Sequence, residues 1–447
     1  MTETTSHHQS LTDIDEQPIN RFHFKMIITA GMGFFTDAYD LFVIGIVTTL
    51  LMPLWQLTPH HVAWLNAASL ASAALGAVLF GWLADRFGRK RIYGIELMIL
   101  IIGACLSAVA PTFIMLLLAR ILVGMGIGGD YPTSAVFASE CANRQNRGAL
   151  VLMVFAMQAL GMIVGPLIAA GLLMADMPHT WTWRILLALG ALPAVSVLYL
   201  RRRIQETPRY LRAQQAPVEV SRVVSELSGY QDAVSHQPVL ATHKLYHKPW
   251  LKYLIGTAGA WFLLDVAFYG NSISSMLIMK SISPDASLMV HMLSTMLMFL
   301  GFAVPGYAFA ACFVDRIGRK RLQILGFAMM ALSYLLIATF PSIKEHLGWF
   351  LPIFGLSFFF INFGPNSTTF LIPSEIYPTS IRAQAHGLSA AIGKCGAFIG
   401  TFFLPIVLHY VGLGVTMAII GSACLLGVAV TFLIPEMKGQ SLDSMDV

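Results

Sequence analysis

Apolar stretches of about twenty residues recur along the whole chain and alternate with short polar segments. A helix that crosses a membrane needs roughly 20 apolar residues, because an α-helix rises only about 1.5 Å per residue. The pattern predicts twelve spans, at residues 25–51, 62–84, 92–110, 113–139, 148–174, 184–203, 252–279, 288–313, 321–340, 348–374, 383–409 and 412–434. We therefore expect an all-α integral membrane protein.

The composition agrees with this class. Hydrophobic residues make up 56% of the 447 residues and charged residues only 11%, whereas a soluble domain carries about 25% charged residues. The formal net charge is +5, but Lys and Arg lie between the apolar runs, so we expect a lipid bilayer and no nucleic acid as partner. The five cysteines show no metal-binding or disulfide spacing, and we expect no metal and no cofactor.

The charge of the connecting segments predicts the orientation in the membrane. Segments 85–91, 140–147, 201–212 and 315–321 are rich in Arg and Lys, whereas the connections at 53–61, 110–112 and 175–183 carry none. Basic connections stay on the cytoplasmic side of a membrane. The sequence thus predicts a multi-pass protein of the plasma (inner) membrane with both termini in the cytoplasm.

The two halves of the chain repeat each other. The motif DRFGRKR at 85–91 returns as DRIGRKR at 315–321, and a Ser-Glu pair followed by Arg recurs at 139–147 and 374–382. A parallel repeat of this kind indicates a transporter built from two bundles. The expected divisions are an N-terminal tail (1–24), a six-helix bundle (25–203), a cytoplasmic linker (204–250), a second six-helix bundle (251–434) and a C-terminal tail (435–447). We expect a cytoplasmic gate formed by Asp85, Arg89, Glu140, Arg147, Asp315, Arg319, Glu375 and Arg382.

Polar side chains occur in the middle third of six predicted spans. An unpaired polar group in hydrocarbon costs several kcal/mol, so these groups are expected to face an internal binding site near the midplane. Among them, Lys394 is expected to be the single cation at this depth, which favours a small anion as ligand. The group comprises Asp37, Asp40, Asp130, Gln158, Asp265, Asn362, Asn366 and Lys394, with Glu96 nearer the end of its span as a possible proton-exit residue.

Spacing groups some of these residues on shared helix faces. Trp261, Asp265 and Tyr269 follow at intervals of four residues, which places them along one face of a helix. Asn362 and Asn366 have the same interval around Gly364-Pro365. Because proline removes a helical hydrogen bond, we expect the tenth span to bend there.

The chain resembles the major facilitator superfamily in its twelve spans, its twice-used DRxGRKR loop and its Arg120-x-x-x-Gly124-x-Gly126 motif. Within that superfamily GFFTDAYDLFVIG (33–45), GGDYPTSAVFASE (128–140), WFLLDVAFYG (261–270) and the segment 363–397 resemble the phosphate:proton symporters. The resemblance implies phosphate binding by Tyr131, Gln158, Trp261, Asp265, Tyr269 and Asn366 with Lys394 close by, proton coupling by Asp37, Asp40 and Asp130, and accessory positions at Glu96 and Asn362.

The expected function is proton-coupled uptake of inorganic phosphate, and of arsenate where the site accepts it, by alternating access in a monomeric unit. Two alternatives remain open from the sequence. One is a proton symporter for an aromatic anion, since Tyr131, Trp261 and Tyr269 offer stacking surfaces. The other is a phosphate sensor that signals without transport. No nucleophile, base and oxyanion donors occur together, so the chain is not expected to be an enzyme.

Overall fold

The computed structural model describes residues 15–16, 18–214, 219, 223, 243–286 and 288–446. The first half contains α2 (Arg21–Trp55), α3 (Pro59–Phe87), α4 (Arg89–Ile92), α5 (Ile95–Val109), α6 (Phe113–Cys141), α7 (Arg147–Ala156), α8 (Gln158–Met174), α9 (His179–Leu189), α10 (Ala191–Arg203) and α11 (Pro208–Ala213). The second contains α13 (Trp250–Ile273), α14 (Ser275–Ile282), α15 (Leu288–Met298), the π-helix η1 (Phe299–Ala303), α16 (Val304–Ile317), α17 (Arg319–Thr339), α18 (Pro341–Glu345), α19 (Leu347–Phe363), α20 (Pro365–Glu375), α21 (Arg382–Thr431) and the 3₁₀ helix η2 (Leu442–Met445). Most of the predicted linker lies outside the described residues.

Within the described part of the chain, eleven helical segments are long and apolar enough to cross a membrane. The last of them, α21, has 50 residues and contains a non-helical residue, Gly412, with φ 76° and ψ 172°. It is therefore two helices that meet at Gly412, and the described segments give twelve crossings, as the apolar pattern predicts. The all-α membrane fold is confirmed.

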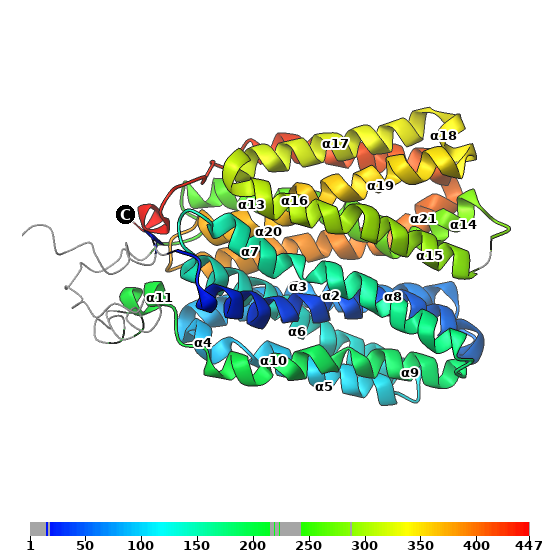
Figure 1. Cartoon of the computed structure of the whole chain (residues 1–447), viewed down its shortest axis with the longest axis horizontal. Helices are drawn as coiled ribbons and strands as arrows, with labels where there is room; N and C mark the ends of the chain where they lie inside the picture. The colour runs from blue at the N-terminus through cyan, green and yellow to red at the C-terminus, as the bar shows by residue number, and fades with distance from the viewer. Residues whose placement is uncertain are drawn as a thin grey trace, which may run out of the picture.

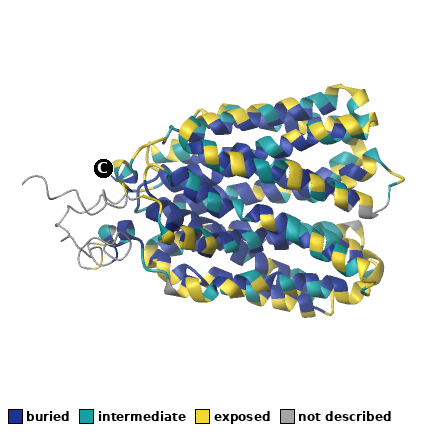
Figure 2. Cartoon of the chain, viewed as in Figure 1, coloured by how far each residue is buried: buried dark blue, intermediate teal, exposed yellow. Residues whose placement is uncertain are grey.

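The long helices run side by side along one axis, with α2–α10 in the lower half of Figure 1 and α13–α21 in the upper half. We call the end that carries α11 and the C-terminal segment the terminal face, and the opposite end the distal face (Figure 1). Large apolar side chains such as Leu75, Leu118 and Leu192 are exposed, and Figure 2 shows that exposed residues lie on the outward sides of the helices. An apolar outer surface suits contact with lipid.

The predicted bend in the tenth span is confirmed. The helix α19 ends at Phe363, Gly364 has the non-helical angles φ −111° and ψ −108°, and α20 restarts at Pro365. A Cβ on Gly364 would lie 2.5 Å from the Cα of Gly326 in α17. A glycine at 364 therefore allows both the break and the close approach of α17, and the break sets the level at which Asn366 enters the interior.

Near the terminal face, α3 of the first half crosses α21 of the second half at two glycines. A Cβ on Gly387 would lie 2.3 Å from the carbonyl oxygen of Ala77 and 3.2 Å from the Cα of Gly81. Because a Cβ cannot approach backbone atoms that closely, the two halves meet at this level only while both positions stay small.

We predict that Gly387→Leu holds the terminal ends of the two halves apart. The leucine must displace the backbone of α3, so the distance between spin labels at the exposed positions Arg86 in α3 and Arg316 in α16 should increase. The labels are introduced as cysteines into a background without the five native cysteines. Gly171→Leu is the matched control because no atom lies within 4 Å of its Cβ position. Equal distances in all three proteins would contradict the prediction.

Candidate functional site

The centre of the molecule contains a lysine held by side chains from both halves. Lys394 Nζ in α21 donates to the hydroxyl of Tyr269 at 3.0 Å and lies 3.3 Å from Asp265 Oδ2, both in α13. The same ammonium lies 4.4 Å from the ring centroids of Tyr131 in α6 and Tyr269. The two tyrosine hydroxyls are 3.4 Å apart. This cluster of Lys394, Asp265, Tyr269 and Tyr131 is the central cluster, and all four side chains are buried.

Trp261 borders the central cluster, and Gln158 is a second predicted ligand with a buried side chain. The rings of Trp261 and Tyr131 are 5.9 Å apart, and a Cβ on Gly393 would lie 2.6 Å from the indole, so glycine makes room for Trp261 beside Lys394. Gln158 is the first residue of α8 and is 4% exposed. Its amide Nε2 has no hydrogen-bond partner among the described residues. A buried donor without a partner points to a ligand or water at this level.

Asn366 is hydrogen-bonded to Tyr307, a buried tyrosine that the sequence did not predict as a site residue. Asn366 Nδ2 donates to the Tyr307 hydroxyl at 2.6 Å and to Asn362 Oδ1 at 2.8 Å. Tyr307 lies in α16 and is 2% exposed. A lone tyrosine in an apolar span carried no spacing signal, because its partner lies 59 residues away in the chain. The nearby hydroxyl of Tyr307 now has to be counted with the predicted donors.

Asp40 does not join the central cluster. Arg120 of α6 binds it through two nitrogens, with Nη1 at 2.7 Å from Asp40 Oδ1 and Nη2 in close contact with Oδ2. Both side chains are buried. Two buried ions that satisfy each other are a fixed pair, so the predicted proton-coupling role of Asp40 has weaker geometric support than that of Asp37.

Asp130 is paired in a similar way, and this pair corrects one expectation. Arg201 of α10 donates to Asp130 at 2.7 and 3.0 Å and to Glu96 at 3.2 Å, and the Ser134 hydroxyl donates to Asp130 at 2.6 Å. Arg201 is fully buried. Lys394 is therefore not the single buried cation at this depth, since Arg120 and Arg201 are buried too. Arg201 was expected in a basic loop, but its long side chain reaches inward from the end of α10.

Glycine 33 makes this ion pair possible next to α2. A Cβ on Gly33 would lie 1.9 Å from Asp130 Oδ2 and 2.1 Å from Arg201 Nη2. The guanidinium also donates to the backbone carbonyls of Thr29 and Ala30 at 3.2 Å each. Arg201 thus connects α10, α6 and α2 through one side chain.

Asp37 differs from the other buried carboxylates of the first half. It is 2% exposed, and neither of its carboxylate oxygens has a hydrogen-bond partner among the residues that the structure describes. Its charged neighbours are Asp130, Arg201, Lys394 and Asp40. Asp37 therefore lies between the ion pairs of the first half and the lysine of the central cluster.

Aromatic side chains close the site on the terminal side. Phe155 and Phe370 stack at 4.3 Å, and Phe34 contacts both Phe370 at 5.0 Å and Tyr131 at 5.3 Å. Phe34 precedes Asp37 by one turn of α2, whose N-terminal end is at the terminal face (Figure 1). The three phenylalanines come from α2, α7 and α20, so residues of both halves separate the central cluster from the terminal face.

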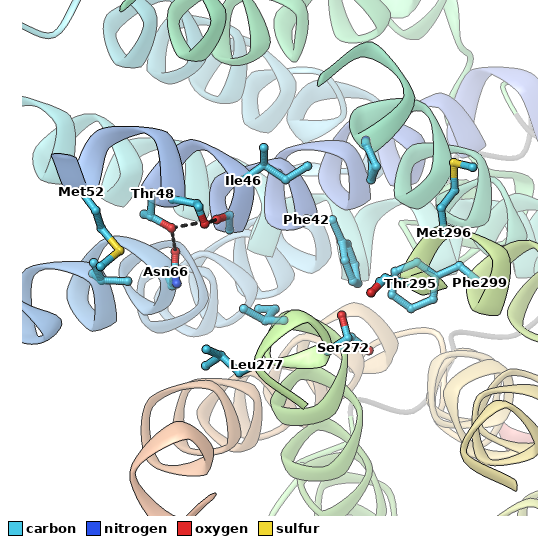
Figure 3. A pocket seen from close by; sticks show the side chains of 16 residues that line it. Phe42, Ile46, Thr48, Met52, Asn66, Ser272, Leu277, Thr295, Met296 and Phe299 are labelled. Carbon is cyan, nitrogen blue, oxygen red and sulfur yellow. Dashed lines mark hydrogen bonds between the residues drawn. The ribbon is translucent and has the colours of Figure 1, made fainter. Parts of the chain in front are cut away.

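On the distal side, a cavity of about 190 Å³ opens between α2, α3 and α8 of the first half and α13–α15 of the second. Phe42 and Phe299, whose rings are 5.7 Å apart, line its inner end. Thr48, Asn66, Ser272 and Thr295 add polar groups to its wall (Figure 3). The cavity therefore lies on the distal side of these aromatic rings, and no side chain of the central cluster lines it.

The two DRxGRKR loops bind the opposite half in nearly the same way. Asp85 accepts from the backbone N–H of Gln384 at 2.6 Å and of Ala383 at 3.3 Å, at the start of α21. Asp315 accepts from Ala149 at 2.8 Å and Gly148 at 3.1 Å, at the start of α7. Each carboxylate thus caps the first turn of a helix from the other half. The terminal face is held closed by this repeated contact.

The arginines and glutamates at the same face are paired unequally. Glu140 contacts Arg89 at 3.2 Å and Arg382 at 2.9 Å, and the second contact crosses between the halves. Glu375 pairs with Arg319 at 2.9 Å within its own half. Arg147, the repeat counterpart of Arg382, lies 3.5 Å from Asp15 instead. The eight predicted gate residues lie together at the terminal face, but only one of the two cross-half pairs is formed.

Segments from both ends of the chain cover this gate. Asp15 accepts from Arg209 at 2.8 Å and from the Ser441 hydroxyl at 2.7 Å. Arg209 also lies 3.3 Å from Asp443. Burial alone would raise the pKa of Asp443, but Arg209 and Arg212 outweigh it and lower this pKa. An ionised Asp443 therefore ties the C-terminal segment to the arginines that follow α10.

Comparison with solved structures defines the class. The chain matches the structure of the major facilitator superfamily proton:xylose symporter XylE bound to 6-bromo-6-deoxy-D-glucose with a TM-score of 0.82 at 20% identity, over 95% of this chain and 98% of that one. A structure of the inward-open conformation of XylE from E. coli gives 0.66, also at 20% identity, over 95% and 99%. The fold is that of the major facilitator superfamily.

The chain belongs to the family described as sugar (and other) transporters, whose model matches residues 25–447. It is similar to inorganic phosphate transporter 1-6 of Oryza sativa subsp. japonica, with 39% identity over 95% of this chain and 92% of the relative. It is also similar to low affinity inorganic phosphate transporter 1 of Petunia hybrida, with 36% identity over 98% and 95%. These relatives are transporters, which confirms the expectation that the chain is not an enzyme.

The fixed pair Arg120–Asp40 gives a stability prediction. Arg120→Leu leaves a buried carboxylate without its cation, and we expect it to lower the free energy of unfolding by about 3–5 kcal/mol. The double variant Arg120→Leu/Asp40→Leu should recover much of this loss because no buried charge remains. Unfolding of the purified protein in detergent measures both. Arg212→Leu, which removes a partner of the partly exposed Asp443, should cost about 1 kcal/mol or less. A double variant less stable than Arg120→Leu would refute the interpretation.

Proposed function

We propose that this protein is a secondary active transporter that takes up inorganic phosphate together with protons. The observation that carries the proposal is the central cluster, in which Lys394 and Asp265 of one half face Tyr131 of the other. A buried cation beside two tyrosine hydroxyls and an indole suits a small oxyanion. The two relatives named as inorganic phosphate transporters support phosphate as that anion.

Each predicted ligand has a chemical role toward phosphate. Tyr131, Gln158, Trp261, Tyr269 and Asn366 donate hydrogen bonds to phosphate oxygens, and Tyr307 is available beside Asn366. Lys394 supplies the positive charge. Asp265 accepts from a P–OH group, which phosphate retains near neutral pH and sulfate lacks, so selection against sulfate follows from this carboxylate.

Proton coupling is proposed on the basis of charge. Each negative charge moved into a cell costs about 2.3 kcal/mol per 100 mV of membrane potential, so uptake of an anion needs compensating protons. In the interior, Arg120, Arg201 and Lys394 face Asp40, Asp130, Glu96, Asp265 and Asp37. Asp37 has neither a cation nor a donor of its own among the described residues. We assign the transported proton first to Asp37, with Asp130 and Glu96 as its neighbours in the route.

The proposed conformational cycle is based on the aromatic side chains that lie on the terminal side and on the distal side of the site. We propose that the terminal face is cytoplasmic, in the plasma membrane, and that bundles 25–203 and 251–434 rock around the central cluster. The gate contacts and the phenylalanines on the terminal side then form when the site is reached through the distal cavity, and they separate for release into the cell.

The first test is uptake of radiolabelled phosphate by proteoliposomes that contain the full chain, with an inward proton gradient. We expect accumulation that a protonophore abolishes and that arsenate inhibits. Asp265→Asn should lower the uptake about tenfold or more, because a hydrogen bond to a charged group is worth about 1.5–3 kcal/mol. The exposed Asp176→Asn is the matched control and should behave as wild type.

The outcome also decides between the three functions considered. Accumulation of 4-hydroxybenzoate without phosphate uptake would replace phosphate by an aromatic anion. Binding of phosphate without any uptake or exchange would identify a sensor. Inhibition by sulfate as strong as that by arsenate would contradict the role given to Asp265.

A second prediction concerns the coupling residue. Asp37→Asn removes the group that we assign to the proton but leaves the phosphate ligands in place. We expect exchange of external for internal phosphate to continue, while accumulation driven by the proton gradient falls to the level seen with protonophore. Gradient-driven accumulation that survives in Asp37→Asn would move the proton to another carboxylate.

A further inference from the structure

A basic groove lies at the terminal end of α5 and α10, and none of the residues that line it belongs to the central cluster or to the eight gate residues. Its volume is about 490 Å³, and its wall contains Lys90, Arg91 and Arg202 together with the apolar side chains of Ile95 and Met98. The three cationic residues are exposed, while Tyr93 and Gly94 form the buried floor. The groove thus brings three positive charges together at one end of the bundle.

These charges are not balanced within the protein. None of the carboxylates in the described part of the chain forms an ion pair with Lys90, Arg91 or Arg202. Glu206 accepts instead from the backbone N–H groups of Arg89 and Lys90 at 3.0 and 3.1 Å, and Glu96 from the N–H of Gly94 and from Arg201. The basic groove therefore keeps an excess of positive charge that an anion from outside the chain can satisfy.

The internal repeat shows that this arrangement is particular to the first half. Glu436 accepts from the backbone N–H groups of Arg319 and Lys320 at 3.0 and 3.1 Å, as Glu206 does in the first half. In this register, Phe432 stands where the first half has Arg202. The ammonium of Lys320 lies 5.6 Å from the ring of Phe432 and donates to its backbone carbonyl. The repeat-related position in the second half therefore has one cationic side chain fewer, and its lysine, Lys320, already contacts Phe432.

The faces of α5 and α10 next to the groove expose large apolar side chains, as expected of a surface that contacts lipid. On α10, Leu192, Val195 and Tyr199 are exposed by 53–66% and lead at intervals of three and four residues to Arg202. On α5, Ile95 and Ile102 are exposed by 43% and 52% and lie two turns apart. The cations thus lie where these apolar faces reach the end of the membrane-spanning segments. A ligand with a phosphate anion at one end and a hydrocarbon chain at the other fits both parts.

We propose that the basic groove binds the phosphate headgroup of an anionic phospholipid from the leaflet at the terminal face. Arg91 and Arg202 contact the phosphate oxygens, and the acyl chains lie along the exposed faces of α5 and α10. Free inorganic phosphate shares the headgroup chemistry but has no group for the apolar faces. This assignment does not depend on what the central cluster transports.

The test compares retention of lipid by the full chain in detergent, with native mass spectrometry as readout and phosphatidylglycerol or phosphatidylcholine of the same acyl chains as probe. We expect the wild type to retain phosphatidylglycerol in preference to phosphatidylcholine. In Arg91→Gln/Arg202→Gln the affinity for phosphatidylglycerol should fall by roughly tenfold or more, because two of the three cations are lost. Lys320→Gln/Arg321→Gln removes two positive charges from the repeat-related loop and should keep the preference.

A titration with inorganic phosphate in the same samples separates the two sources of a phosphate group. Phosphatidylglycerol that stays bound at millimolar phosphate supports the lipid, whereas its displacement by phosphate alone would overturn the lipid assignment. Equal losses in the two double variants, or no preference of the wild type for the anionic lipid, would also overturn it. Thermal unfolding in phosphatidylcholine checks that the exposed substitutions leave the fold intact.

Discussion

The cost of an ionised side chain inside a membrane is the constraint on which this structure depends. A buried charge is stable when it is paired and hydrogen-bonded, and the first half meets this condition twice, with Arg120 on Asp40 and Arg201 on Asp130 and Glu96. These pairs join helices that the chain places far apart. Glycine at position 33 is required because the Arg201–Asp130 pair lies against the backbone of α2. The pairs therefore determine helix packing as well as charge balance.

The cost of burying a charge also distinguishes tightly paired ions, such as Arg201 and Asp130, from the more loosely paired Lys394 and Asp265. Lys394 and Asp265 are paired at 3.3 Å, a longer contact than that between Arg201 and Asp130 at 2.7 Å. An entering oxyanion offers Lys394 a second partner of the same sign as Asp265. Protonation of a neighbouring carboxylate then keeps the local charge constant. In the proposed function, phosphate and proton are therefore linked by charge balance and need no direct contact with each other.

The sequence was sufficient for the features that depend on local pattern. The spans, the break at Gly364-Pro365 and the burial of the polar residues all follow from periodicity and from proline. Contacts that depend on the reach of a long side chain were not predictable. Arg201 belongs to a run of three arginines at a helix end, and nothing in that run shows which one turns inward. Tyr307 was missed for a related reason, since its importance comes from Asn366 on another helix.

The two halves of the internal repeat share some contacts at the terminal face and differ in others, and the differences have a physical consequence. The two aspartates of the DRxGRKR loops cap helices of the opposite half with almost equal geometry, as expected if both halves move by the same rotation. Glu140, however, holds Arg89 and Arg382, while Arg147 is occupied by Asp15 and the backbone of Gln440. The second cross-half pair has thus been exchanged for contacts with the chain termini. In the proposed cycle, opening of this face breaks one inter-half ion pair and also displaces the terminal segments, so the termini contribute to the barrier of that change.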